Sequence, residues 1–171
     1  PAPSFAAPSG PAVQESMGKV SPEYTLQDLL SNPQDEAVFA HHAQSQMVRV
    51  DLARGGVREI GEPGLYAEIS AVGTGQVLLV ERLLQPFSYR VRWNDFAREV
   101  ELRDASGKLI KSLGRIKLKE GVPVEGVITG PRQFWASPAA DGAVYWVEAL
   151  DGGDLRNKVS HRDRLMRLDA P

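Results

Sequence analysis

The chain has 171 residues, the length of one ordinary domain, which is enough to bury a hydrophobic core. Lysine and arginine number 20 against 22 aspartate and glutamate residues, and both signs are scattered along the chain, so nothing in the charge pattern calls for nucleic acid or an anionic membrane as a partner. The absence of cysteine excludes disulfides, thiolate metal sites and a cysteine nucleophile. No stretch approaches the roughly 18 apolar residues that a membrane span needs, and we expect a soluble chain.

The N-terminal part is predicted to have little regular structure. Residues 1–22 are rich in proline, alanine, serine and glycine; such a stretch buries little apolar surface, and we expect an extended lead or loop. Residues 23–44 are predicted to be a helical insertion. A short helix over residues 26–30 ends at Asn32-Pro33, which opens a second helical segment through Ala43.

From residue 45 to 171 the pattern is that of β-structure, in short apolar or alternating runs separated by glycine, aspartate and proline turns. We therefore predict a mainly β chain whose helices are confined to the insertion. The predicted strands are Met47–Leu52, Val57–Ile60, Tyr66–Val72, Val77–Leu83, Ser88–Trp93, Glu99–Arg103, Leu109–Leu113, Gln133–Ala136, Ala143–Leu150 and Arg164–Leu168.

Two kinds of hairpin alternate along these strands. One kind, with a polar glycine-containing turn, covers residues 48–57 and 100–109, and a third copy begins at 165–169. The other kind joins two apolar strands through a tight turn and covers residues 68–81 and 134–148. Their alternation has a period near that of propeller blades, about 40–50 residues.

The repeat predicts a partial β-propeller of about two to two and a half blades of antiparallel strands over residues 45–171. A propeller needs at least about four blades to close its ring. An unclosed run of blades exposes strand edges that tend to associate. We therefore expect an incomplete propeller.

Several blocks along the chain carry a family pattern. They are Gly10-Pro11-Ala12-Val13-Gln14-Glu15, Tyr24-Thr25-Leu26-Gln27-Asp28-Leu29-Leu30, Asp35-Glu36 with Phe39 and Ser45-Gln46-Met47, Ile60-Gly61-Glu62-Pro63-Gly64-Leu65-Tyr66, Pro86-Phe87-Ser88-Tyr89, Gly130-Pro131-Arg132, Trp146-Val147-Glu148-Ala149-Leu150-Asp151-Gly152-Gly153-Asp154, and Arg162-Asp163. In order and spacing they resemble the glutamyl endopeptidase-like branch of the prolyl oligopeptidase family of serine peptidases. The sequence departs from that family at two turns, Val72-Gly73-Thr74-Gly75 and Ala136-Ser137-Pro138.

The resemblance implies a two-domain enzyme in which an N-terminal propeller caps an α/β-hydrolase domain with a Ser-Asp-His triad. This chain would then be a non-catalytic propeller segment, with that hydrolase domain and peptide substrates as its partners, and it would restrict access to the active site. No cofactor is implied. An exported or periplasmic location is implied only by resemblance to bacterial relatives.

The catalytic machinery of such an enzyme is not found in the sequence. The Gly-x-Ser-x-Gly nucleophile motif does not occur, so no catalytic residue is assigned and the chain by itself is expected to be inactive. Ser160-His161, with Asp163 beyond, fits an exposed polar turn better than a triad. His41-His42 lacks the i, i+4 spacing of a helical metal site, and Asp151-Gly152-Gly153-Asp154 fits a turn better than a calcium loop. No metal residue is assigned.

Three arginines, Arg90, Arg92 and Arg132, are candidate substrate-binding residues. Guanidinium groups at the edge of a cavity would attract an acidic substrate. The aromatic residues of the 134–148 hairpin fit packing between blades better than stacking on a ligand. Two alternatives remain open: a stand-alone β-rich binding or scaffold module that self-associates, and a small enzyme in its own right.

Overall fold

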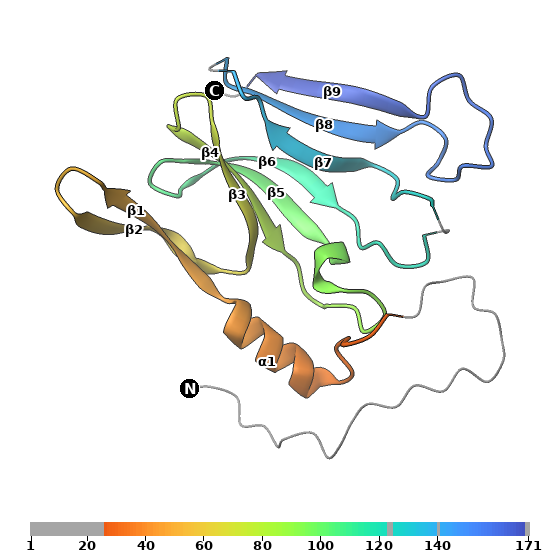
Figure 1. Ribbon diagram of the computed structural model, residues 1–171, viewed down its shortest axis with the longest axis horizontal. Helices are drawn as coiled ribbons and strands as arrows, with labels where there is room; N and C mark the ends of the chain where they lie inside the picture. Colours follow the sequence, from red (N-terminus) through yellow and green to blue (C-terminus); the bar gives the residue numbers. More distant parts are fainter. Residues whose placement is uncertain (1–25, 123–124, 140, 170–171) are drawn as a thin grey trace.

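The computed structural model describes residues 26–122, 125–139 and 141–169, and in this part of the chain it contains one α-helix, nine strands and a short 3₁₀ turn (Figure 1). The strands form three antiparallel sheets. The prediction of a mainly β chain with a short helical insertion is confirmed. The elements are α1 (Pro33–Ala43), β1 (Ser45–Asp51), β2 (Gly56–Gly64), β3 (Tyr66–Val72), β4 (Val77–Leu83), the 3₁₀ turn (Trp93–Asp95), β5 (Arg98–Asp104), β6 (Leu109–Ile116), β7 (Pro131–Ala136), β8 (Ala143–Ala149) and β9 (Asp163–Asp169).

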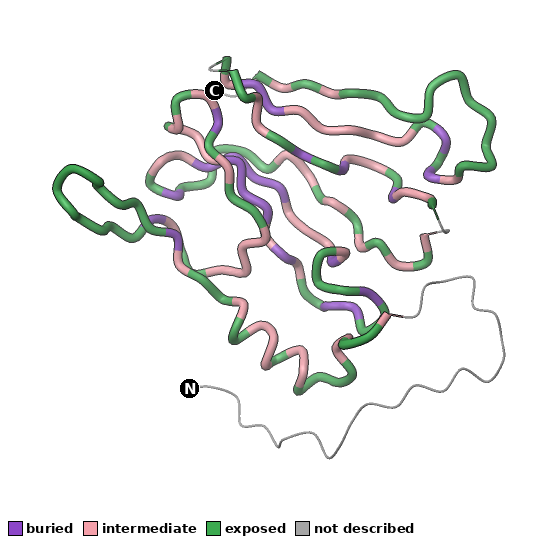
Figure 2. The backbone as a smooth tube through the Cα atoms, in the orientation of Figure 1, coloured by how far each residue is buried: buried purple, intermediate pink, exposed green. Residues whose placement is uncertain are grey.

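The central sheet is a four-stranded meander in the order β3-β4-β5-β6. Its two middle strands are largely buried (Figure 2). Val80, Val100 and Leu102 in these strands each have 0% of their surface exposed. β3 and β4 are joined by a tight turn in which Gly73 and Gly75 have φ of 56° and 81°. Glycine adopts such angles without the steric cost of a Cβ atom, which explains its place in this turn.

The other two sheets are shorter versions of the same meander. The β1–β2 hairpin corresponds in the sequence repeat to β5–β6, and the sheet β7-β8-β9 corresponds to β3-β4-β5. One four-stranded sheet is thus flanked along the chain by a two-stranded and a three-stranded one. This arrangement is consistent with a partial propeller of the predicted extent.

The four-stranded and three-stranded sheets share a hydrophobic core. Leu79 and Leu102 belong to the same buried cluster as Phe134 and Val144, and β3 and β6 both contact β7. The Phe134 ring stacks on the Trp146 ring, with the ring centroids 5.5 Å apart. Apolar area removed from water here holds the two sheets together.

The helix is anchored beside the connection between β4 and β5. α1 begins after Asn32, whose side-chain oxygen accepts a hydrogen bond from the Asp35 amide at 3.0 Å, as expected of an N-cap. Phe39 packs edge-on against Phe87 and Phe96, with ring centroids 5.1 and 5.9 Å away. No helix in the described ranges is long and apolar enough to cross a membrane.

Two sequence predictions are wrong. Residues 26–30 form no helix, and Asp28 lies in the left-handed region with φ 58°, which an α-helix does not allow. The alternation over Ser88–Trp93 comes from a loop that ends in the 3₁₀ turn, because Phe87 and Val91 turn inward to the cluster around Phe96. The predicted lead, residues 1–22, lies outside the described residues.

Candidate functional site

A cleft of about 350 Å³ opens between the four-stranded sheet and β7. Its lining is rich in charge, because the strands bring charged side chains to the end of the sheets where β5 and β7 begin. Its charged residues are Glu68, Glu81, Arg98, Lys119 and Arg132. The lining also includes apolar residues, among them Ile128 and Phe134.

Arg132 is the one predicted site residue that lines this cleft. It is buried, with 8% of its surface exposed, and its guanidinium group donates to Gln133 Oε1 at 2.8 Å and to Asp163 Oδ1. Its Nε atom is buried and has no hydrogen-bond partner among the described residues. Gln133 has φ 53° at an irregularity between β7 and β8, so the local backbone departs from regular pairing beside this arginine. Arg132 is thus held in a fixed position.

A second, half-buried arginine also lines the cleft. Arg98 of β5 donates to Glu81 Oε2 of β4 at 2.7 Å and to the Asn94 carbonyl oxygen at 2.7 Å. Its ion pair with Glu81 is almost completely shielded, with 16% and 5% of the two side chains exposed. Breaking such a pair leaves a buried charge uncompensated, so this pair fixes the shape of the cleft.

The other two candidate arginines do not line this cleft. Arg90 is exposed and lies 3.2 Å from Glu120 Oε1. Arg92 borders a different hollow of about 260 Å³, which is lined mainly by apolar residues such as Leu29, Phe39 and Trp93. Residues adjacent in the sequence line the two hollows, since Trp93 borders one and Asn94 the other.

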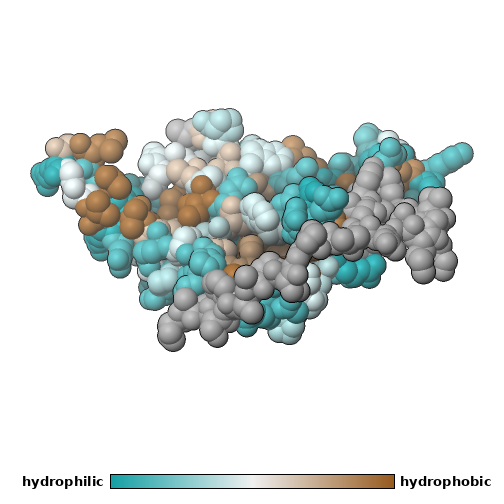
Figure 3. Space-filling view, turned by 60° about the horizontal axis from the view of Figure 1, so that its bottom comes forward, coloured by the Kyte–Doolittle hydropathy of each residue, from teal (hydrophilic) through white to brown (hydrophobic). Residues whose placement is uncertain are grey.

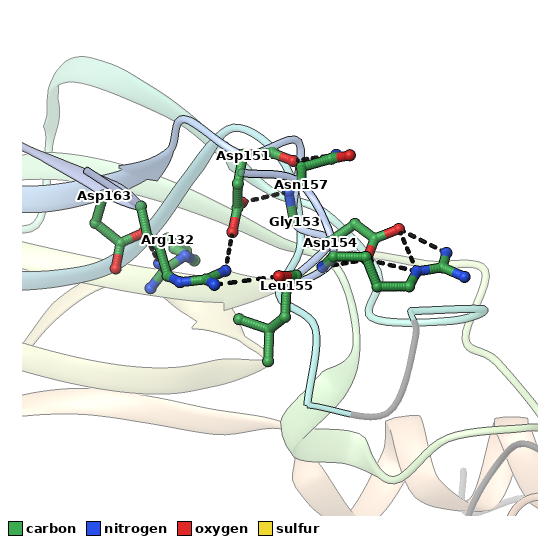
Figure 4. Close-up of polar contacts among 9 residues, drawn as sticks. Arg132, Asp151, Gly153, Asp154, Leu155, Asn157 and Asp163 are labelled. Carbon is green, nitrogen blue, oxygen red and sulfur yellow. Dashed lines mark hydrogen bonds and ion pairs between the residues drawn. The ribbon is translucent and has the colours of Figure 1, made fainter. Parts of the chain in front are cut away.

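The aspartates around the loop after β8 are paired with arginines (Figure 4). Asp151 is buried, and its carboxylate accepts from the Gly153 amide at 2.8 Å and from Arg162 Nη1 at 3.1 Å. Asp154 pairs with Arg156, whose hydrogen bonds lower the Asp154 pKa to about 2. Both carboxylates are thus occupied within the loop, as in a structural turn.

Gly153 docks the same loop onto the segment before β7. It has φ 79°, and a Cβ atom there would lie 2.0 Å from the Val127 carbonyl oxygen. Its own carbonyl oxygen accepts from the Val127 amide at 3.0 Å. Only glycine allows this close backbone approach, so the loop is part of the packing of the three-stranded sheet.

The histidines show no catalytic or metal-binding arrangement in the described ranges. His161 Nδ1 lies 3.3 Å from Ser160 Oγ on the surface, and Asp163 is bonded to Arg132 instead. His41 and His42 pack edge-on to each other at the end of α1. Among the described residues no group of three possible ligands could hold a metal ion.

The aromatic prediction holds in part. Trp146 packs on Phe134 in the shared core, whereas Trp135 is 40% exposed and stacks on Tyr145 with the ring centroids 5.7 Å apart. Trp93 is 50% exposed. Sequence reasoning missed Asp163 as the partner of Arg132 and Glu81 as the partner of Arg98, because a charged residue within a strand pattern gives no sign of its long-range partner.

Two curated relatives cover most of the chain. It is 35% identical over 159 residues to a protein of Oryza sativa subsp. japonica and 33% identical over 160 residues to one of Arabidopsis thaliana, each named "Probable glutamyl endopeptidase, chloroplastic". Both alignments cover 91% of this chain, but the chain spans only 17% and 16% of the relatives' lengths. No family model matches, and no solved structure matches. The chain is therefore related to a segment of the glutamyl endopeptidases, as the sequence blocks predicted.

Proposed function

We propose that this chain is a non-catalytic segment of the β-propeller of a glutamyl endopeptidase-like serine peptidase. The observation that carries the proposal is the row of antiparallel sheets, with two, four and three strands in chain order. The chain that forms them spans only 16–17% of the length of its relatives. Blades of four antiparallel strands are the repeating unit of propellers. In the parent enzyme the segment caps the α/β-hydrolase domain and restricts access to peptide substrates.

The packing between the two larger sheets supports a gating role. Phe134 stands in the shared core and also backs the charged cleft. If adjacent sheets form part of a wall around the active site, weakening this contact widens the routes by which large substrates enter. Access then depends on packing between blades and not on a group that takes part in the chemistry.

The gating proposal is tested in the full-length parent with Phe134→Ala. We expect kcat/KM for a long unfolded substrate to rise several-fold relative to that for a short glutamyl peptide, while hydrolysis of the short peptide is little changed. The matched control is Leu155→Ala, which truncates a residue that is 42% exposed in the loop after β8. An unchanged ratio in a measurably less stable Phe134→Ala enzyme contradicts the gating role.

We also propose that Arg90, Arg92 and Arg132 raise the positive potential on the face that an acidic substrate approaches. Their support is the buried, fixed Arg132 together with two exposed arginines on the β4–β5 connection. Arg90→Gln and Arg92→Gln in the parent are expected to lower the preference for glutamyl over glutaminyl peptides, more so at low salt. Arg54→Gln, in the β1–β2 turn, is the control. The same preference for glutamyl over glutaminyl peptides in all these variants would contradict the proposal.

A second candidate function is supported by the exposed apolar side chains of the β1–β2 hairpin. They fit a stand-alone binding or scaffold module that self-associates. Light scattering on the 171-residue chain separates the two cases, because a mass that rises steeply with concentration favours the module.

A further inference from the structure

The hollow between α1, the segment before it and the β4–β5 connection lies outside the sheets. It has a volume of about 260 Å³, and its described lining is at residues 27–30, 91–93 and 96 and at Phe39 of α1, so none of that lining belongs to a strand. Strand faces are where sheets stack on one another, whereas segments at the end of a rigid scaffold commonly carry binding sites. This hollow is therefore placed to receive a ligand and not a neighbouring sheet.

Part of the lining of this hollow is an apolar cluster. Phe39, Val91 and Phe96 line it, and Val91 and Phe96 are only 9% and 2% exposed. The Phe39 and Phe96 rings lie edge to face with their centroids 5.9 Å apart. An apolar cavity of about 150 Å³ is large enough to bind benzene. The hollow therefore has room for one aromatic or large aliphatic side chain, which would meet aromatic rings there.

Concave shape distinguishes the hollow from the exposed apolar side chains of the β1–β2 hairpin. Those side chains gather on an element that projects from the rest of the molecule (Figure 3). Ligand sites are concave, because a pocket removes most of the ligand surface from water. The hollow beside α1 is thus the better binding site of the two.

The hollow is preformed, because hydrogen bonds hold its walls together. Glu36 of α1 accepts from the Phe87 amide at 3.1 Å through Oε1 and from the Tyr89 hydroxyl at 3.0 Å through Oε2. The 3₁₀ turn that follows is closed by the Asp95 amide, which donates to the Arg92 carbonyl oxygen at 2.9 Å. A ligand that binds here does not have to order these segments, which lowers the entropic cost of binding.

Polar groups of the lining are free to contact a ligand. Trp93 is 50% exposed and Arg92 is exposed, and neither the indole nor the guanidinium group makes a hydrogen bond or ion pair within the described residues. Tryptophan and arginine are enriched among the side chains that dominate binding energy at interfaces. Asp28, exposed and unpaired in the same ranges, adds a hydrogen-bond acceptor. A ligand with an apolar group, a carboxylate and an N–H donor matches this set.

We propose that the hollow docks an unfolded peptide by taking up one aromatic or large aliphatic side chain, while Arg92 pairs with an acidic residue next to it in the peptide. Trp93 covers the inserted side chain, and Asp28 accepts a hydrogen bond from the peptide backbone. The proposal rests on the proposed function, because the peptides that a glutamyl endopeptidase cleaves contain an acidic residue. It adds to that function a place where the peptide is held.

The test is peptide binding to the full-length parent, measured by the line broadening of a fluorine label at the amino end of the peptide. The probe is a decapeptide of glycine and serine with a central Phe-Asp pair and no glutamate, so it offers no glutamyl bond for cleavage. Replacing its phenylalanine by alanine is expected to weaken binding about tenfold or more, since one apolar side chain is no longer buried. Replacing its aspartate by asparagine is expected to weaken binding about two- to fivefold, as for an exposed ion pair.

Substitutions in the parent carry the same test to the protein. Trp93→Ala is expected to weaken binding of the Phe-Asp peptide about tenfold, and Trp93→Phe gives a smaller loss if that variant does not fold. Arg92→Gln is expected to weaken the Phe-Asp peptide but not the Phe-Asn peptide, and Arg92→Glu is expected to favour a Phe-Lys peptide. The controls are Arg54→Gln in the β1–β2 turn and Leu155→Ala in the loop after β8, both at exposed positions outside the hollow.

The outcomes separate this proposal from the proposed function. Equal binding of the Phe-Asp and Ala-Asp peptides, or no effect of Trp93→Ala, overturns the docking hollow, and the proposed function stands if that parent hydrolyses glutamyl peptides. Docking by a parent that hydrolyses none supports the hollow and overturns the proposed function. Tighter binding of the Phe-Lys peptide to the unchanged parent overturns the acidic partner. A dimer that requires Trp93, or binding seen only after residues 1–25 are replaced by glycine and serine, assigns the hollow to a second copy or to the chain itself and also overturns the proposal.

Discussion

Replacing Gly107 by alanine tests how the hairpin is docked to the four-stranded sheet. Gly107 lies in the β5–β6 turn with φ 86°, and a Cβ atom there would lie 2.3 Å from the Gly61 nitrogen and 2.5 Å from its Cα. The left-handed angle costs about 1 kcal/mol for alanine. The clash forces the backbones apart and breaks the hydrogen bond from the Gly61 amide to the Ser106 carbonyl oxygen, which adds about 1–2 kcal/mol. We expect a loss of about 2–3 kcal/mol.

The matched control is Gly55→Ala in the β1–β2 turn. Gly55 has a similar φ of 69°, but its Cβ would meet nothing within 4 Å, so this variant reports only the cost of the backbone angle. Urea unfolding followed by tryptophan fluorescence gives both free energies, and hydrogen exchange locates the change in β1 and β2. If the two variants lose the same stability, the close approach of Gly107 and Gly61 contributes nothing and the docking argument is refuted.

Three further predictions concern single contacts. Arg162→Ala should cost about 1–2 kcal/mol, since it removes the cation from the buried Asp151 carboxylate, and an unchanged urea midpoint would contradict this. Asp154 has a pKa lowered from 3.8 to about 2, so its stabilising effect is present above pH 3.8 and is lost as the pH falls through about 2. In Arg156→Ala, NMR titration should show the Asp154 pKa rise toward 3.8. An unchanged Asp154 pKa would be inconsistent with the ion pair. Phe39→Ala should cost about 2–3 kcal/mol and release α1, seen as faster hydrogen exchange in the helix; slow exchange would show that α1 is held by other contacts.

The alternation of apolar residues and the glycine turns were sufficient to predict most strands. Tyr66–Val72 and Val77–Leu83 match β3 and β4 at both ends, because each is a mostly apolar run and the two are separated by a glycine turn. The helix through Ala43 followed from Asn32-Pro33, a local capping signal. Ser88–Trp93 was misread because alternation in a loop looks the same as in a strand when Phe87 is buried by contacts distant in sequence.

What the sequence by itself determined is the mainly β character, the repeat and the relationship, since these depend on local pattern and on the order of the blocks. The tertiary structure alone decided which charges meet. It buried Arg132 against Asp163, set Arg92 beside a different hollow, and paired Glu81 with Arg98. Long-range ion pairs form only where sheets bring separate strands together, and a linear pattern holds no record of the distances between them.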